Sequence, residues 1–272
     1  MMSVRWRSRA LTAWTALAAA FLYLPILVVI VYSFNTDRFL LQWSGAGVQG
    51  YVQALGNRAL RQALATSLVV AATSAAGAVV VGGLAGFALA RREGPWRRPV
   101  EAALLLVLVA PEIVVGLAYL IAFVSVGLTW GLGRLVLGHM VFSSAVVTVI
   151  VRARLSGVDA ALEEAAADLG ATPLRVFVDV TLPAMRPALG AGALLAFTFS
   201  FDDVVTSAFV STAGQVTLPV YIFSALRTGL KTEHAAITVL TFAGTVAALV
   251  LAWWLLKRAS GRGAVWASFA GH

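Results

Sequence analysis

The chain contains no cysteine, only three histidines and only two lysines. Without cysteine, neither a disulfide framework nor a thiolate metal site can form. The histidines are scattered, at His139, His234 and His272, so they indicate no metal cluster. A P-loop ends in Gly-Lys-Ser or Gly-Lys-Thr, whereas Lys231 and Lys257 both follow leucine. The chain therefore has no P-loop of its own.

Charge is also scarce. Of the 272 residues, 12% are charged and 60% are hydrophobic, and the mean hydropathy is +0.90. A soluble domain averages about 25% charged residues, so this chain has too little polar surface to cover a globule in water. The net charge of +8 does not indicate nucleic acid as a partner, because the basic residues flank apolar stretches and form no continuous stripe. A lipid bilayer is the expected solvent.

Long apolar runs follow one another along the whole chain. A membrane-spanning helix needs about 20 mostly apolar residues, and six segments qualify or come close. They are 11–31, 64–90, 102–126, 135–151, 188–210 and 235–256, of which the fourth is short and the fifth is interrupted by Asp202 and Asp203. The expected fold is an all-α polytopic membrane protein with six transmembrane helices.

The first apolar segment could be mistaken for a signal peptide, because Arg5, Arg7 and Arg9 precede it. Its apolar run is longer than the roughly 7–15 residues of a signal core and continues through Pro25 to Val31. We therefore interpret it as a retained span.

Basic residues set the expected orientation. With the N-terminus in the cytoplasm, most of them fall inside, namely Arg5, Arg7, Arg9, Arg91, Arg92, Arg97, Arg98, Arg152, Arg154, Arg175, Arg186, Lys257, Arg258 and Arg262. The outside receives the smaller set Arg38, Arg58, Arg61, Arg134, Arg227 and Lys231. This bias follows the positive-inside rule and predicts that both termini are cytoplasmic.

Small residues line the second apolar segment. Gly77, Gly82, Gly83 and Gly86 lie along it, and Gly82 and Gly86 form a small-xxx-small pair. Such residues let helix backbones approach closely in lipid. We interpret these glycines as helix-packing positions.

The segment 152–186, between the fourth and fifth spans, is predicted to form two short cytoplasmic helices. Acidic residues early in the first helix suit the positive end of its dipole, and Gly170 suits a left-handed C-terminal turn. Thr172 and Pro173 have the pattern of an N-cap followed by a first-turn proline. We expect Pro183 to stop the second helix and Pro187 to open the fifth span. On physics alone, docking into another protein and a plain amphipathic connector remain alternatives.

This segment resembles the signature of ABC importer permeases. That signature reads Glu-Ala-Ala, three residues, Gly, nine residues, Ile, any residue, Leu-Pro. Here it is matched by Glu164, Ala165, Ala166, Gly170, Val180, Leu182 and Pro183, with Val in place of Ile as the one departure. The resemblance implies the type I ABC importer permease fold, with 152–186 as the loop that couples to an ATPase.

The same resemblance implies partners and a domain organisation. The expected partners are two ABC ATPase subunits that bind ATP and Mg, a second permease subunit with a different sequence, and an extracytoplasmic solute-binding protein. The chain itself is expected to bind no cofactor and to lie in the bacterial inner membrane. Residues 1–60 would hold the N-terminal tail, first helix and external loop, 61–256 the permease core, and 257–272 a cytoplasmic tail.

Three carboxylates interrupt the apolar spans and are candidates for a solute pathway. Glu112 follows Pro111 about ten residues into the third span, which is about 15 Å deep at about 1.5 Å per residue. Asp202 and Asp203 are expected in the outer half of the bilayer. Ionisable groups inside spans usually face a bundle interior or a water-filled path. A cation path and a polar structural joint both remain open, while Tyr119 and Trp130 are interpreted as packing or interfacial aromatics.

The sequence around Asp202 and Asp203 resembles one group of these permeases more than the others. Residues 199–210, with Thr217-Leu-Pro219 and 222–229, resemble the permeases of spermidine/putrescine importers, most of all the second of their two membrane subunits. The resemblance implies a polyamine or another small cationic amine as solute. Related permeases for iron, thiamine, phosphonates and opine-like compounds share much of the scaffold and are the alternatives within the class. A channel or secondary transporter is the alternative from another class, but it would leave the cytoplasmic signature unexplained.

Overall fold

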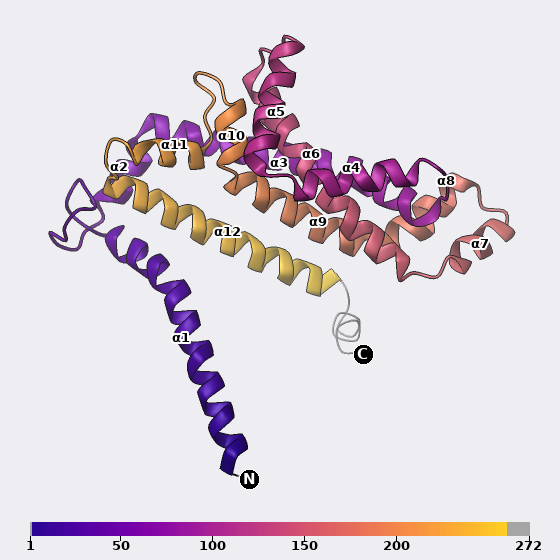
Figure 1. Cartoon of the computed structure of the whole chain (residues 1–272), viewed down its shortest axis with the longest axis horizontal. Coiled ribbons are helices and arrows are strands. Elements are labelled where there is room, and N and C mark those ends of the chain that lie inside the picture. Colours follow the sequence, from indigo (N-terminus) through magenta and orange to yellow (C-terminus); the bar gives the residue numbers. More distant parts are fainter. Residues whose placement is uncertain (1, 260–272) are drawn as a thin grey trace. The chain divides into compact units, whose positions relative to one another are not determined.

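The computed structural model describes the backbone of residues 2–259 (Figure 1). Within this range the chain is helical, with isolated β-bridges and no strand. Its contacts divide it into two units, residues 1–61 with 225–272 and residues 62–224, which we describe separately. Most of the expected C-terminal tail, residues 260–272, lies outside the described range, and its first residues continue a helix.

The first unit contains the helices α1 (Met2–Tyr32), α2 (Gln49–Gly56) and α12 (Thr232–Ala259). The start of α12 is held by polar contacts from this unit. The Thr232 backbone N–H donates to the Arg38 carbonyl at 3.0 Å, and Asn57 Nδ2 donates to Glu233 Oε2 at 3.1 Å. Buried polar groups need such partners, so these bonds fix where α12 begins.

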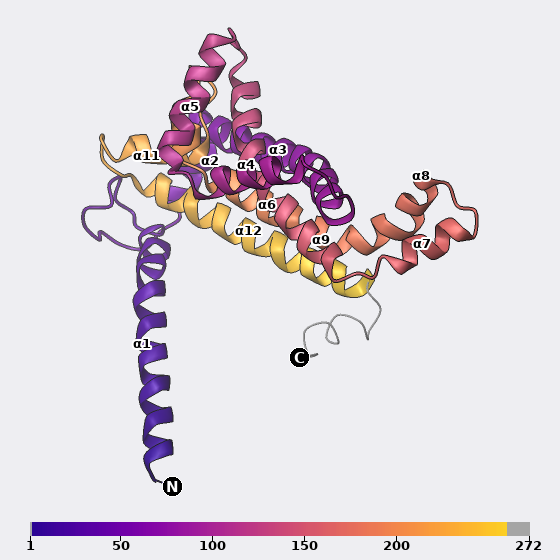
Figure 2. The ribbon, with the colours of Figure 1, turned by 45° about the vertical axis from the view of Figure 1, so that its right-hand side comes forward.

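The second unit holds the remaining helices. They are α3 (Arg58–Arg91, whose first turn belongs to the first unit), α4 (Arg97–Val109), α5 (Glu112–Ser125), α6 (Gly131–Ser156), α7 (Ala161–Asp168), α8 (Pro173–Val176), the π-helical turn η1 (Phe177–Thr181), α9 (Leu182–Asp202), α10 (Val205–Val210) and α11 (Leu218–Ala225). In both ribbon views α6 runs beside α9, and α7 and α8 project beyond the start of α9 (Figure 2).

Glycine brings α3 against α6, as the small-residue pattern predicted. A Cβ atom added at Gly82 would lie 2.5 Å from the Ser144 carbonyl oxygen, and one at Gly86 would lie 2.8 Å from that of Thr148. Neither distance leaves room for a side chain. The main core of this unit continues from the contact and includes the buried residues Ala75, Ala78, Val147, Val151, Leu155, Met185, Ala188 and Ala196.

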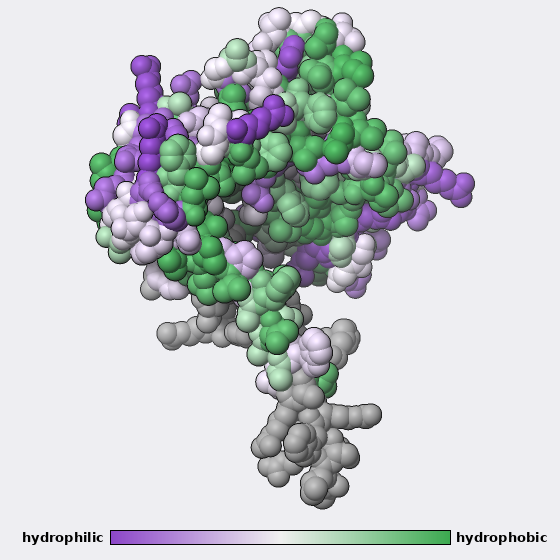
Figure 3. Space-filling model, turned by 60° about the vertical axis from the view of Figure 1, so that its left-hand side comes forward, coloured by the Kyte–Doolittle hydropathy of each residue, from purple (hydrophilic) through white to green (hydrophobic). Residues whose placement is uncertain are grey.

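Four helices of the described chain are long and apolar enough to cross a membrane. They comprise residues Leu11–Tyr32, Arg58–Arg91, Gly131–Ser156 and Pro173–Asp202, and the bent pair α4 and α5 makes a fifth if it counts as one span. The sixth expected span, 235–256, lies on the 28-residue helix α12. Hydrophobic residues cover much of the visible surface (Figure 3), as a lipid-facing protein requires. The polytopic all-α fold is confirmed, and its span count remains approximate.

The third span is not the straight helix that the apolar run predicted. It breaks between α4 and α5 with a bend of 112°. Ala110, at the break, has extended backbone angles of φ −60° and ψ 139°. The residue before a proline is pushed out of the helical region, so Pro111 explains the break. The depth of about 15 Å expected for Glu112 in a straight helix therefore no longer applies.

The prolines after the loop also act differently from our expectation. Pro183 does not stop a helix and Pro187 does not open one, because α8, η1 and α9 form one helical stretch over Pro173–Asp202. The π-helical turn explains this continuity. The Leu182 N–H bonds to the Phe177 carbonyl, and such a wider turn absorbs a local disruption of the hydrogen-bond ladder.

Candidate functional site

The three predicted pathway carboxylates line one cavity in the second unit. Glu112, Asp202 and Asp203 contribute to its wall, together with residues of α4, α5, α6 and α9. The cavity has a volume of about 640 Å³, within the roughly 300–1,000 Å³ usual for small-molecule sites. Glu112 and Asp202, which are 90 positions apart in the sequence, are thus brought to one place.

The charge of this cavity has a single sign. Apart from the three carboxylates, the described residues that line it are apolar, aromatic, tyrosine and threonine side chains, and none of them is Lys, Arg or His. A wall with uncompensated carboxylates and apolar surroundings attracts cations, and the apolar surroundings focus the field. The arrangement therefore suits a positively charged solute and disfavours an anion.

The three carboxylates lie at breaks in two helical segments, where the chain borders the cavity. Glu112 is the first residue of α5, directly after the bend at Pro111. Asp202 is the last residue of α9, and Asp203 has an extended backbone with ψ 115°. Irregular backbone at membrane depth is tolerated where it is buried in protein or lines a cavity. Both breaks meet that condition.

The two adjacent aspartates have different surroundings. Asp203 Oδ1 accepts a hydrogen bond from the Ser207 backbone N–H at 3.2 Å, so it caps the short helix α10. Among the described residues, Asp202 and Glu112 form no hydrogen bond or ion pair. The hypothesis of a structural joint thus fits Asp203, while the other two carboxylates remain available to a ligand.

A buried histidine behind the cavity was missed by our sequence reading. His139, on α6 and 3% exposed, places Nδ1 at 2.7 Å from Ser200 Oγ and Nε2 at 2.9 Å from Ser207 Oγ. It thereby joins α9 to α10 across the break that contains Asp203. The available signal was its position inside an apolar span, where an ionisable residue is a functional candidate by default.

Tyr119 and Trp130, both expected to be packing or interfacial aromatics, have different surroundings. Tyr119 lines the cavity, and its hydroxyl is buried without a hydrogen-bond partner among the described residues. It also stacks on Phe123, with 6.1 Å between ring centroids, so the packing role predicted for it holds in part. Phe142 and Phe199 meet edge to face in the same wall. Trp130, by contrast, is 62% exposed and does not line the cavity.

The residues of the predicted coupling signature begin on the projecting helix α7 and continue through η1 to the start of α9. Gly170 ends α7 with φ +87°, and the Ala171 N–H bonds back to the Ala166 carbonyl at 3.1 Å. This is the left-handed turn that the glycine predicted. Thr172 occupies the N-cap position before Pro173, although its side chain makes no capping bond.

Three of the seven signature residues are exposed in the single chain. Glu164, Ala165 and Gly170 are exposed, whereas Ala166 and Val180 are half-buried. Leu182 and Pro183 are half-buried at the start of α9. In addition, Leu162 is 58% exposed and Leu169 is 89% exposed. The two leucines of the apolar face of α7 are therefore left largely uncovered by the described part of the chain.

No group of three or more potential ligands in the described part of the chain could hold a metal ion. The cavity carboxylates are included in that statement. The described lining of the cavity offers electrostatic attraction, hydrogen bonding and contact with aromatic faces.

Comparison with known proteins assigns the chain to a class of membrane proteins that serve in transport. The family described as "Binding-protein-dependent transport system inner membrane component" matches residues 78–259, and the chain belongs to this family. It is accordingly a permease subunit of an ABC importer and a multi-pass inner-membrane protein.

Individual relatives agree with this assignment. The chain is 38% identical over 251 residues to the putrescine transport system permease protein PotI of Escherichia coli strain K12, covering 89% of each chain. It is 38% identical to the spermidine/putrescine transport system permease protein PotC of Haemophilus influenzae, covering 85% of this chain and 90% of the relative. A bacterial ABC transporter involved in alginate import has a similar fold, with a TM-score of 0.72, 18% identity and coverage of 95% and 98%.

Proposed function

We propose that this permease admits a small cationic amine of the polyamine class. The acidic cavity carries the proposal, because among the described residues Glu112 and Asp202 line it without a polar partner and no basic side chain contributes to it. The PotI and PotC relatives, whose names specify putrescine and spermidine, support the same solute class. An anionic phosphonate would be repelled by such a wall, so the cavity argues against that alternative.

The proposed assembly contains partners that the chain alone does not supply. A second permease subunit, two ATPase subunits that bind ATP and Mg²⁺, and an extracytoplasmic solute-binding protein complete it. The family's description as binding-protein-dependent supports the last of these. We propose that both termini and the segment 152–186 face the cytoplasm, and that the exposed signature around Glu164 and Gly170 docks on an ATPase.

Uptake by the whole complex in proteoliposomes tests the solute pathway. A charge pair about 4 Å apart is worth about 4 kcal/mol at an effective dielectric near 20, before desolvation is subtracted. The net effect must be smaller, and we expect Asp202→Asn and Glu112→Gln each to slow putrescine or spermidine uptake roughly tenfold, equivalent to about 1.4 kcal/mol. Glu93→Gln is the matched control, because Glu93 is exposed and does not line the cavity.

Two further measurements test the solute pathway and the solute class separately. Wild-type uptake by the Asp202→Asn, Glu112→Gln double variant would exclude the cavity as the pathway. If the solute-binding protein that activates the complex binds no amine in calorimetry, the polyamine proposal fails while the permease assignment stands.

A further inference from the structure

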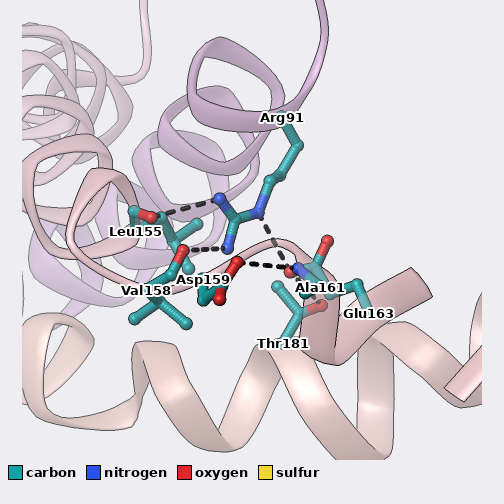
Figure 4. A network of polar contacts seen from close by, with 7 residues as sticks. All are labelled: Arg91, Leu155, Val158, Asp159, Ala161, Glu163 and Thr181. Carbon is teal, nitrogen blue, oxygen red and sulfur yellow. Dashed lines mark hydrogen bonds and ion pairs between the residues drawn. The ribbon is translucent and has the colours of Figure 1, made fainter. Parts of the chain in front are cut away.

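Arg91, the last residue of α3, reaches the junction between α6 and α7 (Figure 4). Its Nη1 donates to the Leu155 carbonyl at 3.2 Å and its Nη2 donates to the Val158 carbonyl at 3.1 Å. Its Nε donates to Glu163 Oε1 at 3.0 Å. One guanidinium thus binds the end of one helix and the first turn of the next.

The contacts follow from the chemistry of helix ends. The last carbonyls of a helix have no partner within it, and a cation is favoured at that end of the dipole. Arg91 meets both needs at the end of α6. Glu163 lies in the first turn of α7, where a negative charge is favoured for the same reason. Only a forked guanidinium offers donors in the directions of both carbonyls and the carboxylate.

Glu163 extends the cluster to a fourth element. Its Oε1 also accepts a hydrogen bond from Thr181 Oγ1 at 3.0 Å. Thr181 is 1% exposed and ends η1, directly before α9. The cluster of Arg91, Glu163 and Thr181, hereafter the Arg91 clasp, therefore joins α3, α6, α7 and the root of α9.

Burial distinguishes this ion pair from others on the same side of the unit. The side chains of Arg91 and Glu163 are 13% and 19% exposed. Those of Arg152 and Glu101 are 38% and 32% exposed at 2.8 Å, and exposed pairs of that kind contribute little. The Arg91–Glu163 pair is more shielded from water, and removing one partner of such a pair leaves the other charge without compensation.

Two neighbouring glutamates face different surroundings. Glu163 binds the clasp, whereas Glu164, the first residue of the coupling signature, is exposed. The helix α7 is thus attached to the unit on one side and leaves its signature free on the other. A displacement applied at the exposed side of α7 can therefore be transmitted to α3 and α9 through the contacts of the Arg91 clasp.

We propose that Arg91 and Glu163 are positioning residues that make the 152–186 segment move as one body with α3 and α9. The inference rests on the proposed coupling role of that segment. Displacement of α7 by the ATPase passes through Arg91 to α3 and through Thr181 to α9. The far end of α9 is Asp202, so the clasp connects the docking surface to the helix that lines the cavity.

The test measures the ATP hydrolysed per solute transported by the whole complex in proteoliposomes. Arg91→Met and Glu163→Ala should keep ATP hydrolysis but reduce uptake about tenfold, with normal yield of the complex. Glu163→Gln keeps an acceptor oxygen for both donors and should retain most uptake. A role in folding alone would lower the yield and leave this ratio unchanged. Arg92→Met is the control, because Arg92 is exposed and its side chain lies outside the clasp.

A double-mutant cycle adds an independent reading. Arg91→Met combined with Glu163→Ala removes both charges, so the double variant should be no more uncoupled than either single one. If Arg91→Met is not recovered, Thr181→Val decides, since it keeps the side-chain shape and removes only the hydroxyl donor to Glu163.

The outcomes distinguish the clasp from the coupling role. A wild-type ratio in the recovered clasp variants, together with uncoupling by Gly170→Val, would overturn the clasp alone. A wild-type ratio in the clasp variants and in Gly170→Val would overturn the coupling role of the segment as well. Additive effects in the cycle would also count against a direct link between Arg91 and Glu163.

Discussion

Asp203 Oδ1 accepts a hydrogen bond from the Ser207 backbone N–H at 3.2 Å. This bond distinguishes Asp203 from the adjacent carboxylate of Asp202. Asp203 has a structural partner, and Asp202 has none among the described residues. Asp203→Asn would keep an oxygen that can accept this hydrogen bond, whereas Asp203→Ala would not.

We therefore expect the two positions to respond differently to substitution. Asp203→Asn should assemble normally, whereas Asp203→Ala should lose about 1 kcal/mol of stability, as expected for a lost helix cap. Asp202→Ala should leave stability unchanged and reduce uptake. Thermal unfolding of the complex in detergent, measured beside uptake, checks this division. Equal loss of stability in Asp202→Ala and Asp203→Ala would contradict it.

His139 should matter for stability more than for the charge of the cavity. His139→Leu leaves the hydroxyls of Ser200 and Ser207 without their buried partner, and each unsatisfied group costs about 1–3 kcal/mol. The complex should dissociate at a lower temperature in detergent. His139→Gln, whose amide can donate and accept, should recover part of that loss. A leucine variant as stable as the wild type would show that the bridge contributes nothing.

Gly170→Val should uncouple transport from ATP hydrolysis while the helices stay folded. The backbone at Gly170 has φ +87°, which a β-branched residue resists. An added Cβ atom meets nothing within 4 Å in this chain, so the remaining obstruction would arise at the docked partner. Gly157→Ala is a matched control, because a Cβ there makes only an ordinary contact at 3.7 Å. Normal uptake with normal ATPase stimulation in Gly170→Val would contradict the expectation.

The orientation can be tested with single cysteines, since the natural chain has none. A cysteine at Arg98 should react with a membrane-impermeant maleimide only from the cytoplasmic side, and one at Gly56 only from outside. Gly56 is preferable to its neighbour Asn57, whose side chain accepts the Ala59 N–H at 3.1 Å at the start of α3. The reverse labelling pattern would overturn the orientation and the placement of the 152–186 segment.

The sequence predicted the features that depend on local chemistry. Hydropathy located the apolar helices, and Gly170 indicated its left-handed turn, because few other residues adopt that conformation. The carboxylates stood out because charge is rare in a span. Their meeting in one cavity was not predictable, since it depends on how α4, α5 and α9 pack together.

The errors concern prolines, whose effect depends on what surrounds them. Pro111 was placed inside a span but bends it by 112°. Pro183 was expected to end a helix, yet η1 widens the helix just before it and the helix continues. Pro111 therefore interrupts its helix, whereas the helix that contains Pro183 continues past it. No rule based on sequence alone separates these outcomes, because the compensating π-helical turn is a property of the fold.

The uninterrupted helical stretch from Pro173 to Asp202 has a thermodynamic consequence. One end is the projecting helix α8, and the other end reaches the acidic cavity. If ATPase docking at the first end changes the affinity for an amine at the second, then linkage requires the amine to change the docking affinity by the same factor. A permease loaded with solute should thus hold its ATPase more tightly or more loosely than an empty one. The sign of that difference would reveal which step of the cycle the stretch favours.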